Sequence, residues 1–180
     1  ILDAAFLNFV ITDIKNYFEK TLQRSLQEID LSLFTSYLTL DAGINEGKNE
    51  VQFLFVYDKE SRHLQHCQPS DLQEDLNGVA FQSPYGEFSF AGVPSEGMVS
   101  REDLFMDLLS VVSDSVDVKR MIVVSFNEEY GKKVTDVLQG LKGKEVMQFR
   151  MNEPEIPVNY KWDMLAFPVM HSLGIRAEEL

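Results

Sequence analysis

The spacing of apolar side chains is clearest between residues 119 and 151. Residues 121–124 form a continuous apolar run, which is typical of a strand covered on both faces. From residue 129 to residue 141 the apolar positions recur every three or four residues, and this spacing predicts a helix. Residues 146–149 return to a strand pattern. A strand, a helix and a strand with short joints predict a right-handed parallel crossover.

The chain before this unit shows the same two spacings. Residues 1–3 have the pattern of a strand end, and the helical spacing that starts at Phe6 predicts a helix to about residue 23. Asp30 is expected to cap a second helix. Residues 51–57 are nearly all apolar, which predicts a strand in the centre of the sheet.

Turn and capping residues mark the shorter elements. Ser70 is expected to cap a short helix over residues 71–76. A tight turn at residues 83–86 predicts a β-hairpin within residues 79–90. Ser100 is expected to cap the next helix.

The C-terminal thirty residues have a weaker pattern. Two prolines after residue 151 predict an extended linker. Residues 162–173 are rich in apolar side chains, but Pro168 allows only a short or kinked helix there.

Together these elements predict an α/β fold, namely a three-layer α/β/α sandwich with a mostly parallel sheet of about five strands and a small antiparallel hairpin. The sequence has no internal repeat and no domain-sized linker, so its 180 residues are expected to form a single domain. Within it, residues 151–180 form a C-terminal tail that packs on the domain or on a partner.

Charge and composition narrow the classes of function. The chain has 29 Asp and Glu against 16 Lys and Arg, a net charge of −13. Because nucleic-acid binding depends on neutralising phosphates with Lys and Arg, a wide nucleic-acid groove is disfavoured. No apolar run reaches the ~20 residues of a membrane-spanning helix, so no membrane partner is expected. The sequence begins at Ile1 rather than Met, and we expect further residues, with any address signal among them, to precede it.

The single cysteine bears on location and on metal binding. Cys67 has no partner for an internal disulfide, which is compatible with a reducing, cytoplasmic location. His63, His66 and Cys67 lie close together and could supply metal ligands. Since His171 is the only other histidine, no second ligand group completes a tetrahedral site. A solvated connection is the favoured interpretation of this stretch.

Carboxylates follow the predicted strands. Asp3 ends the first strand, Asp58 ends the second, and residues 125–129 follow the apolar run 121–124. The carboxyl ends of parallel strands meet at one edge, so we expect these groups to lie together, with Asp103 facing the same edge. Such oxygen-rich sites suit Mg²⁺ or Mn²⁺, and metal-activated water cleaves phosphodiesters.

The order of elements over residues 1–149 resembles the PIN-like fold and, within it, the NYN-type nuclease domains. Members of that family place an Asp at the end of the first strand, which Asp3 matches. They place an Asn three residues later, where this chain has Phe6. An acidic residue on the helix before the fourth strand is matched by Asp103.

The second motif of that family is S-G-D-x-D-F after the fourth strand. In this chain Ser125 and Tyr130 match it, and Glu129 keeps the acidity of the second Asp. Phe126 replaces the Gly and Asn127 replaces the first Asp. Asn127 offers a metal only a neutral oxygen, so the resemblance implies a weakened site.

The resemblance thus implies Asp3, Asp103 and Glu129 as metal ligands for Mg²⁺ or Mn²⁺, with Asn127 as the fourth catalytic position. We expect a soluble α/β domain that is catalytically weakened and acts as a binding or interaction module. One alternative is an active Mg²⁺- or Mn²⁺-dependent ribonuclease, and another is a homo-oligomeric structural protein.

The same residues also have a purely structural interpretation. Asp3 is suited to capping the first helix, and Asp103 complements the dipole of its own helix. Asn127 and Glu129 are residues that a helix N-terminus prefers without any function.

Overall fold

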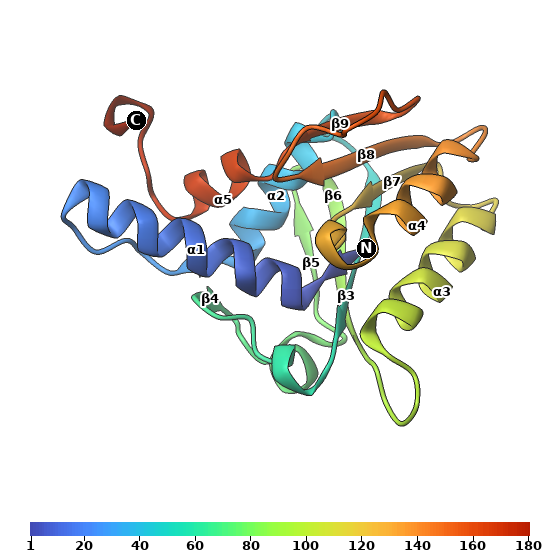
Figure 1. Cartoon of the computed structure of the whole chain (residues 1–180), viewed down its shortest axis with the longest axis horizontal. Coiled ribbons are helices and arrows are strands. Elements are labelled where there is room, and N and C mark those ends of the chain that lie inside the picture. The colour runs from blue at the N-terminus through green and yellow to red at the C-terminus, as the bar shows by residue number, and fades with distance from the viewer.

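The strands run through the middle of the molecule, with helices to either side (Figure 1). The computed structural model describes residues 1–180. One group of helices is α1 (Ala4–Leu22), α2 (Leu31–Asp41) and α5 (Ala166–Ser172). The other group is α3 (Arg101–Asp114) and α4 (Asn127–Gln139).

Two larger sheets and one two-stranded sheet contain all the strands. The first larger sheet has the order β1 (Leu2–Asp3), β3 (Asn49–Tyr57), β6 (Gly86–Pro94), β5 (Ala80–Ser83). The second has the order β7 (Arg120–Val123), β8 (Glu145–Arg150), β9 (Lys161–Met164). The two-stranded sheet pairs β2 (Ile29–Asp30) with β4 (Cys67–Gln68). Every pair is parallel except β5 with β6, so the mostly parallel α/β class and the antiparallel hairpin are confirmed.

The two larger sheets meet at the N-terminal residues. Leu2 forms a parallel bridge with Val124, just past the end of β7. The Asp3 N–H donates to the Val124 carbonyl at 2.9 Å, and the Val124 N–H donates to the Ile1 carbonyl at 3.0 Å. Across this bridge, the strands of the two larger sheets follow the order β5-β6-β3-β1-β7-β8-β9. The chain leaves β1 for β3 on one side and later returns to β7 on the other, so the strand order reverses at β1.

Two apolar clusters lie against the strands. The larger one contains 28 buried residues and draws on α1, α2 and α5, whereas the smaller contains nine and draws on α3 and α4. Successive residues of a strand point to opposite faces. Phe55 of β3 accordingly belongs to the larger cluster and its neighbour Val56 to the smaller one. β3 therefore has a packed apolar layer on each face, as expected for a strand in the centre of a sheet.

Capping residues set the starts of the helices. Asp30 Oδ1 accepts from the Ser32 N–H at 2.9 Å, and Ser100 Oγ accepts from the Asp103 N–H at 3.0 Å, as predicted. The short turn η2 (Leu72–Leu76) differs, because its cap is Asp71 and not Ser70. The Ser70 hydroxyl instead donates to the Leu64 carbonyl, so it is already engaged.

The tail differs in part from its prediction. Trp162 lies in β9, a parallel strand beside β8, and the helix begins only at Ala166. Fully buried side chains of the tail, among them Leu165 and Leu173, belong to the larger cluster. The tail thus packs on its own domain, and a last turn, η3 (Ala177–Glu179), follows it. No helix has the length and apolar character needed to cross a membrane.

Candidate functional site

The candidate site lies at the carboxyl ends of β1, β3 and β7. Asp3 is the last residue of β1 and Asp58 directly follows β3. Ser125 and Phe126 follow β7 and lead into α4. Since these strands are parallel, all three ends reach the same edge of the molecule, beside the point where the strand order reverses.

Arg101, the first residue of α3, lies at the centre of this edge. Its Nε donates to Asp3 Oδ2 at 3.0 Å, its Nη1 donates to Asp58 Oδ2, and its Nη2 donates to Glu129 Oε1. The three guanidinium nitrogens thus bind carboxylates from three separate segments of the chain. We call these four residues the arginine–carboxylate cluster.

Asp3 is the innermost member of the cluster and is fully buried. Its Oδ1 accepts from the Phe6 N–H at 3.1 Å, which caps α1. Its Oδ2 accepts from Arg101 and from the Tyr130 hydroxyl. A buried carboxylate is costly unless it is paired and hydrogen-bonded, and here both oxygens have donors. The structural interpretation of Asp3 as a helix cap is therefore confirmed, alongside its role in the cluster.

Tyr130 reaches Asp3 from α4. The backbone of α4 leaves helical geometry at this residue, with φ −146° and ψ 25°. Burial first, and the Asp3 charge second, raise the pKa of the Tyr130 phenol. The phenol therefore stays protonated at neutral pH and serves as a donor to Asp3.

The charges of the cluster stabilise one another. Burial alone would lower the pKa of Arg101, but the carboxylates, Asp3 foremost, outweigh it, and the pKa is raised. Burial would raise the pKa of Asp58, but hydrogen bonds from Ser61 and Arg101 outweigh it, and the pKa is lowered. Both groups are consequently charged at neutral pH.

An aromatic side chain covers the guanidinium. The Arg101 Cζ lies 5.6 Å from the centre of the Phe126 ring, within the range of a cation–π contact. Phe126 in turn packs against Phe6, with ring centres 5.2 Å apart, and against Phe9 at 6.0 Å. Phe126 stands where the nuclease motif has Gly, and in this chain it closes one side of the cluster.

The structure brings together only two of the four predicted site residues. Asp3 and Glu129 share Arg101. Asn127 accepts a hydrogen bond from the Ser125 hydroxyl at 2.7 Å, and makes no bond to the cluster. Asp103 lines a separate groove between α3 and α4. Asp103 follows Arg101 by two residues, so its side chain points about 200° around the helix from that of Arg101.

The residues as arranged do not fit a divalent ion. No group of three or more His, Cys, Asp or Glu side chains is placed to hold one. Between Asp3 and Glu129 the cation is the Arg101 guanidinium. The histidine-rich stretch has no such metal-holding group either. There His63 Nε2 lies 3.3 Å from Asp71 Oδ2, and Cys67 is buried in β4.

Arg101 is the functional residue that sequence reasoning missed. It directly follows the capping Ser100, in the first turn of α3, where the helix dipole favours acidic side chains. A cation at such a position is weakly disfavoured by the dipole. That mismatch is the one signal in the sequence that could have pointed to the cluster.

Fold and site together define an α/β protein whose parallel strand ends are bound by one half-buried arginine. The chain belongs to the family described as a family of unknown function (DUF6621), which matches over residues 1–180. A search of curated proteins and a search of solved structures each gave no match.

Proposed function

We propose that this protein is a catalytically weakened relative of the PIN-like, NYN-type nucleases that acts as a binding or interaction module. The observation that carries the proposal is Arg101, which binds Asp3, Asp58 and Glu129 at the edge where such a nuclease site would lie. The scaffold we propose is the three-layer α/β/α sandwich. The two apolar clusters against opposite faces of β3 support it.

The chemistry of a guanidinium explains why such a site would be weak. A divalent ion cleaves phosphodiesters by coordinating water and lowering its pKa, and by neutralising developing charge. A guanidinium carries one delocalised charge and has no free coordination position. All three carboxylates of the cluster are also engaged by its N–H donors. In this arrangement the carboxylates hold the loops together and are not available to a metal.

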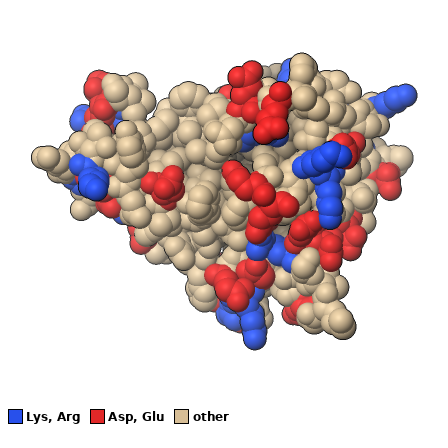
Figure 2. Space-filling view, viewed as in Figure 1, with Lys and Arg blue, Asp and Glu red and all other residues tan.

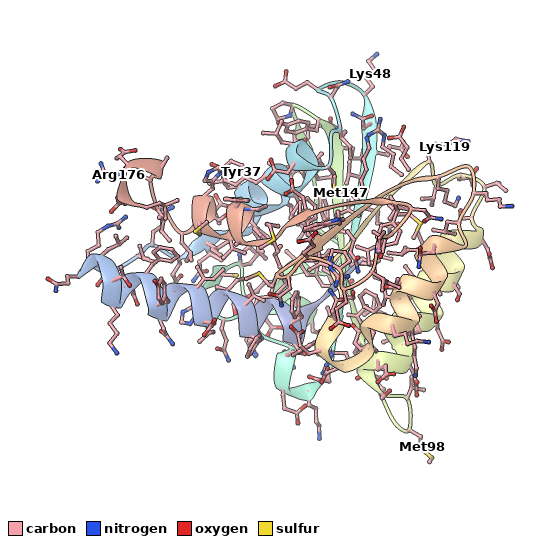
Figure 3. All side chains as sticks on the ribbon, turned by 45° about the horizontal axis from the view of Figure 1, so that its top comes forward. Tyr37, Lys48, Met98, Lys119, Met147 and Arg176 are labelled. Carbon is pink, nitrogen blue, oxygen red and sulfur yellow. The ribbon has the colours of Figure 1, made fainter.

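The surface that best fits a partner is the groove between α3 and α4. It has a volume of about 600 Å³. Its apolar side chains are Met98, Val99, Met106 and Val137. Met98 is fully exposed at the tip of the loop before α3 and points away from the body of the molecule (Figure 3).

Charge indicates what kind of partner fits this groove. Three acidic residues, Asp103, Asp107 and Asp136, line it beside a single cation, Lys133, which is paired with Glu102. Figure 2 shows acidic side chains gathered over the part of this face where α3 and α4 lie. Methionines are common at adaptable binding surfaces, and acidic rims attract basic groups. The partner we propose is a protein segment that carries both basic and apolar side chains.

Incubation with single-stranded RNA and Mn²⁺ tests the loss of catalysis. We expect no cleavage above a protein-free control. Cleavage by the wild-type chain that is lost in Asp3→Asn would contradict the proposal and establish the active ribonuclease. Light scattering tests the homo-oligomer alternative, for which we expect the mass of one chain, because the tail packs on its own domain.

A further inference from the structure

A gap lies between β3 and β7 at the end opposite to the arginine–carboxylate cluster. β1 has only two residues, and it pairs with β3 only at Phe55 and Val56. Residues 49–54 of β3 pair with β6 on one side and with no strand on the other. β7 likewise pairs with β8 alone, because its bridge to Leu2 lies past its end, at Val124. Two strand edges thus face each other with no strand between them.

The space between these edges is a cavity of about 870 Å³, which we call the strand slot. Both edges line it, residues 49–54 on one side and 119–122 on the other. Leu38 and Ile44, from the α2 side, and Val112 and Val118, from the α3 side, also line it. Apolar side chains from both helix layers therefore border the slot, as a buried parallel strand requires.

Ile1 lies at the inner end of the slot and is placed as the next residue of a strand. Its nitrogen donates to the Ile122 carbonyl at 2.9 Å, and its carbonyl accepts from the Val124 N–H. These bonds continue the parallel ladder that Asp3 begins with Val124. The Ile1 side chain borders the slot and is half-buried, but its nitrogen is enclosed between the strands. Burial lowers the pKa of this amino group to about 5, so the position suits a neutral peptide N–H better than an ammonium.

We propose that the strand slot holds the peptide segment that continues β1 from the Ile1 nitrogen, that is, the residues immediately before Ile1 in the native chain. About three residues pair with both strands, since Val123 of β7 already lies beside Ile1 and residues 120–122 remain. The segment pairs in parallel with β3 on one side and with β7 on the other.

The existing register fixes how these residues lie. Leu2 aligns with Phe55 and Val124, so the residue before Ile1 aligns with Phe53 and Ile122. Its side chain faces the larger apolar cluster, to which Phe53 belongs. The residue before that one aligns with Met121 and faces the smaller cluster. We therefore expect both to be apolar.

A covalently joined segment fits better than a separate peptide. A separate strand in the same direction would place its terminal carboxylate inside the slot, beside the Ile1 amino group. That carboxylate would then lose its hydration, which costs several kcal/mol. A continuous chain has a neutral amide at this place and loses no translational freedom on docking.

Amide hydrogen exchange tests this proposal. The experiment compares the native chain, with its upstream residues, with the chain that begins at Ile1. In a parallel pair, the backbone N–H and C=O groups of every second residue point to the same neighbouring strand. By this alternation, the N–H groups of Leu54 and Ile122 point into the slot. We expect at least a hundredfold slower exchange of both in the native chain, whereas the Phe53 N–H, which faces β6, keeps the same rate. Equal rates at Leu54 and Ile122 in the two proteins would overturn the proposal.

Two further measurements identify the occupant. Changing the two residues before Ile1 to Asp in the native chain should abolish the protection of Leu54 and Ile122. Retained protection would show that something else fills the slot. A synthetic peptide of the upstream sequence, added to the chain that begins at Ile1, should give no protection at micromolar concentration. Full protection by that peptide would contradict the requirement for a covalent joint.

Discussion

The two ends of β1 lie in contrasting surroundings. At the carboxyl end, Asp3 has a donor for each oxygen, and Arg101 has a carboxylate for each of its three nitrogens. At the amino end, β3 and β7 face a cavity without a strand between them. The first end is closed by its own side chains, and the second is open to a further segment. The comparison teaches that the carboxylates at the closed end join separate segments of the chain through one guanidinium.

The largest expected effect comes from Arg101→Ala, which breaks the closed end. The change leaves Asp3 buried without its cation, and removing one partner of a buried pair costs about 3–5 kcal/mol. Thermal or urea unfolding measures the loss. Arg101→Lys is the matched control, because it keeps the charge but replaces the planar five-donor guanidinium with one compact ammonium, and we expect an intermediate loss. A loss below about 0.5 kcal/mol for Arg101→Ala, the level of an ordinary surface change, would show that the cluster does not stabilise the fold.

Tyr130→Phe removes a single donor from Asp3 and leaves the ring in place. A hydrogen bond to a charged group contributes about 1.5–3 kcal/mol, so we expect a loss within that range in urea unfolding. Tyr160→Phe is a suitable control, because its hydroxyl donates to the uncharged Gln148 side chain and should contribute less. Equal losses in the two variants would argue against a charged Asp3.

Much of the fold follows from the sequence, and so does the meeting of Asp3, Asp58 and Glu129 at one edge, but the arginine that joins them does not. α1 and the β7–α4–β8 crossover have long periodic patterns, and the structure has them where they were predicted. The short helix predicted within residues 162–173 misses the strand at Trp162, because a four-residue strand has too few positions to show alternation. Arg101 contacts residues 98, 43 and 28 positions away, and no local pattern reports such contacts.

Acid should open the cluster through Asp58. A carboxyl whose pKa is lowered by folding contributes stability above its ordinary pKa of 3.8, and this stability is lost as the pH falls toward the folded-state value. We therefore expect the melting temperature to fall below pH 4, and to fall less steeply in Asp58→Asn. Identical pH profiles for the two proteins would indicate that Asp58 does not respond to Arg101 and Ser61.

The smallest effect is expected at Asp103, which the structure places outside the cluster. Asp103 is exposed on the groove between α3 and α4, so Asp103→Asn should change the free energy of unfolding by less than about 0.5 kcal/mol. The comparison is with Asp3→Asn, which removes a buried charge that three donors bind, and should cost several times more. Comparable losses would mean that Asp103 belongs to the same site.

Calorimetric titration with Mn²⁺ of the wild-type chain and of Arg101→Ala tests most directly whether the guanidinium stands where a metal would bind. The account predicts no binding heat for the wild-type chain. For the variant it predicts measurable binding that Asp3→Asn removes, because three carboxylates then lack a cation. Mn²⁺ binding by the wild-type chain that depends on Asp3 and Glu129 would contradict it.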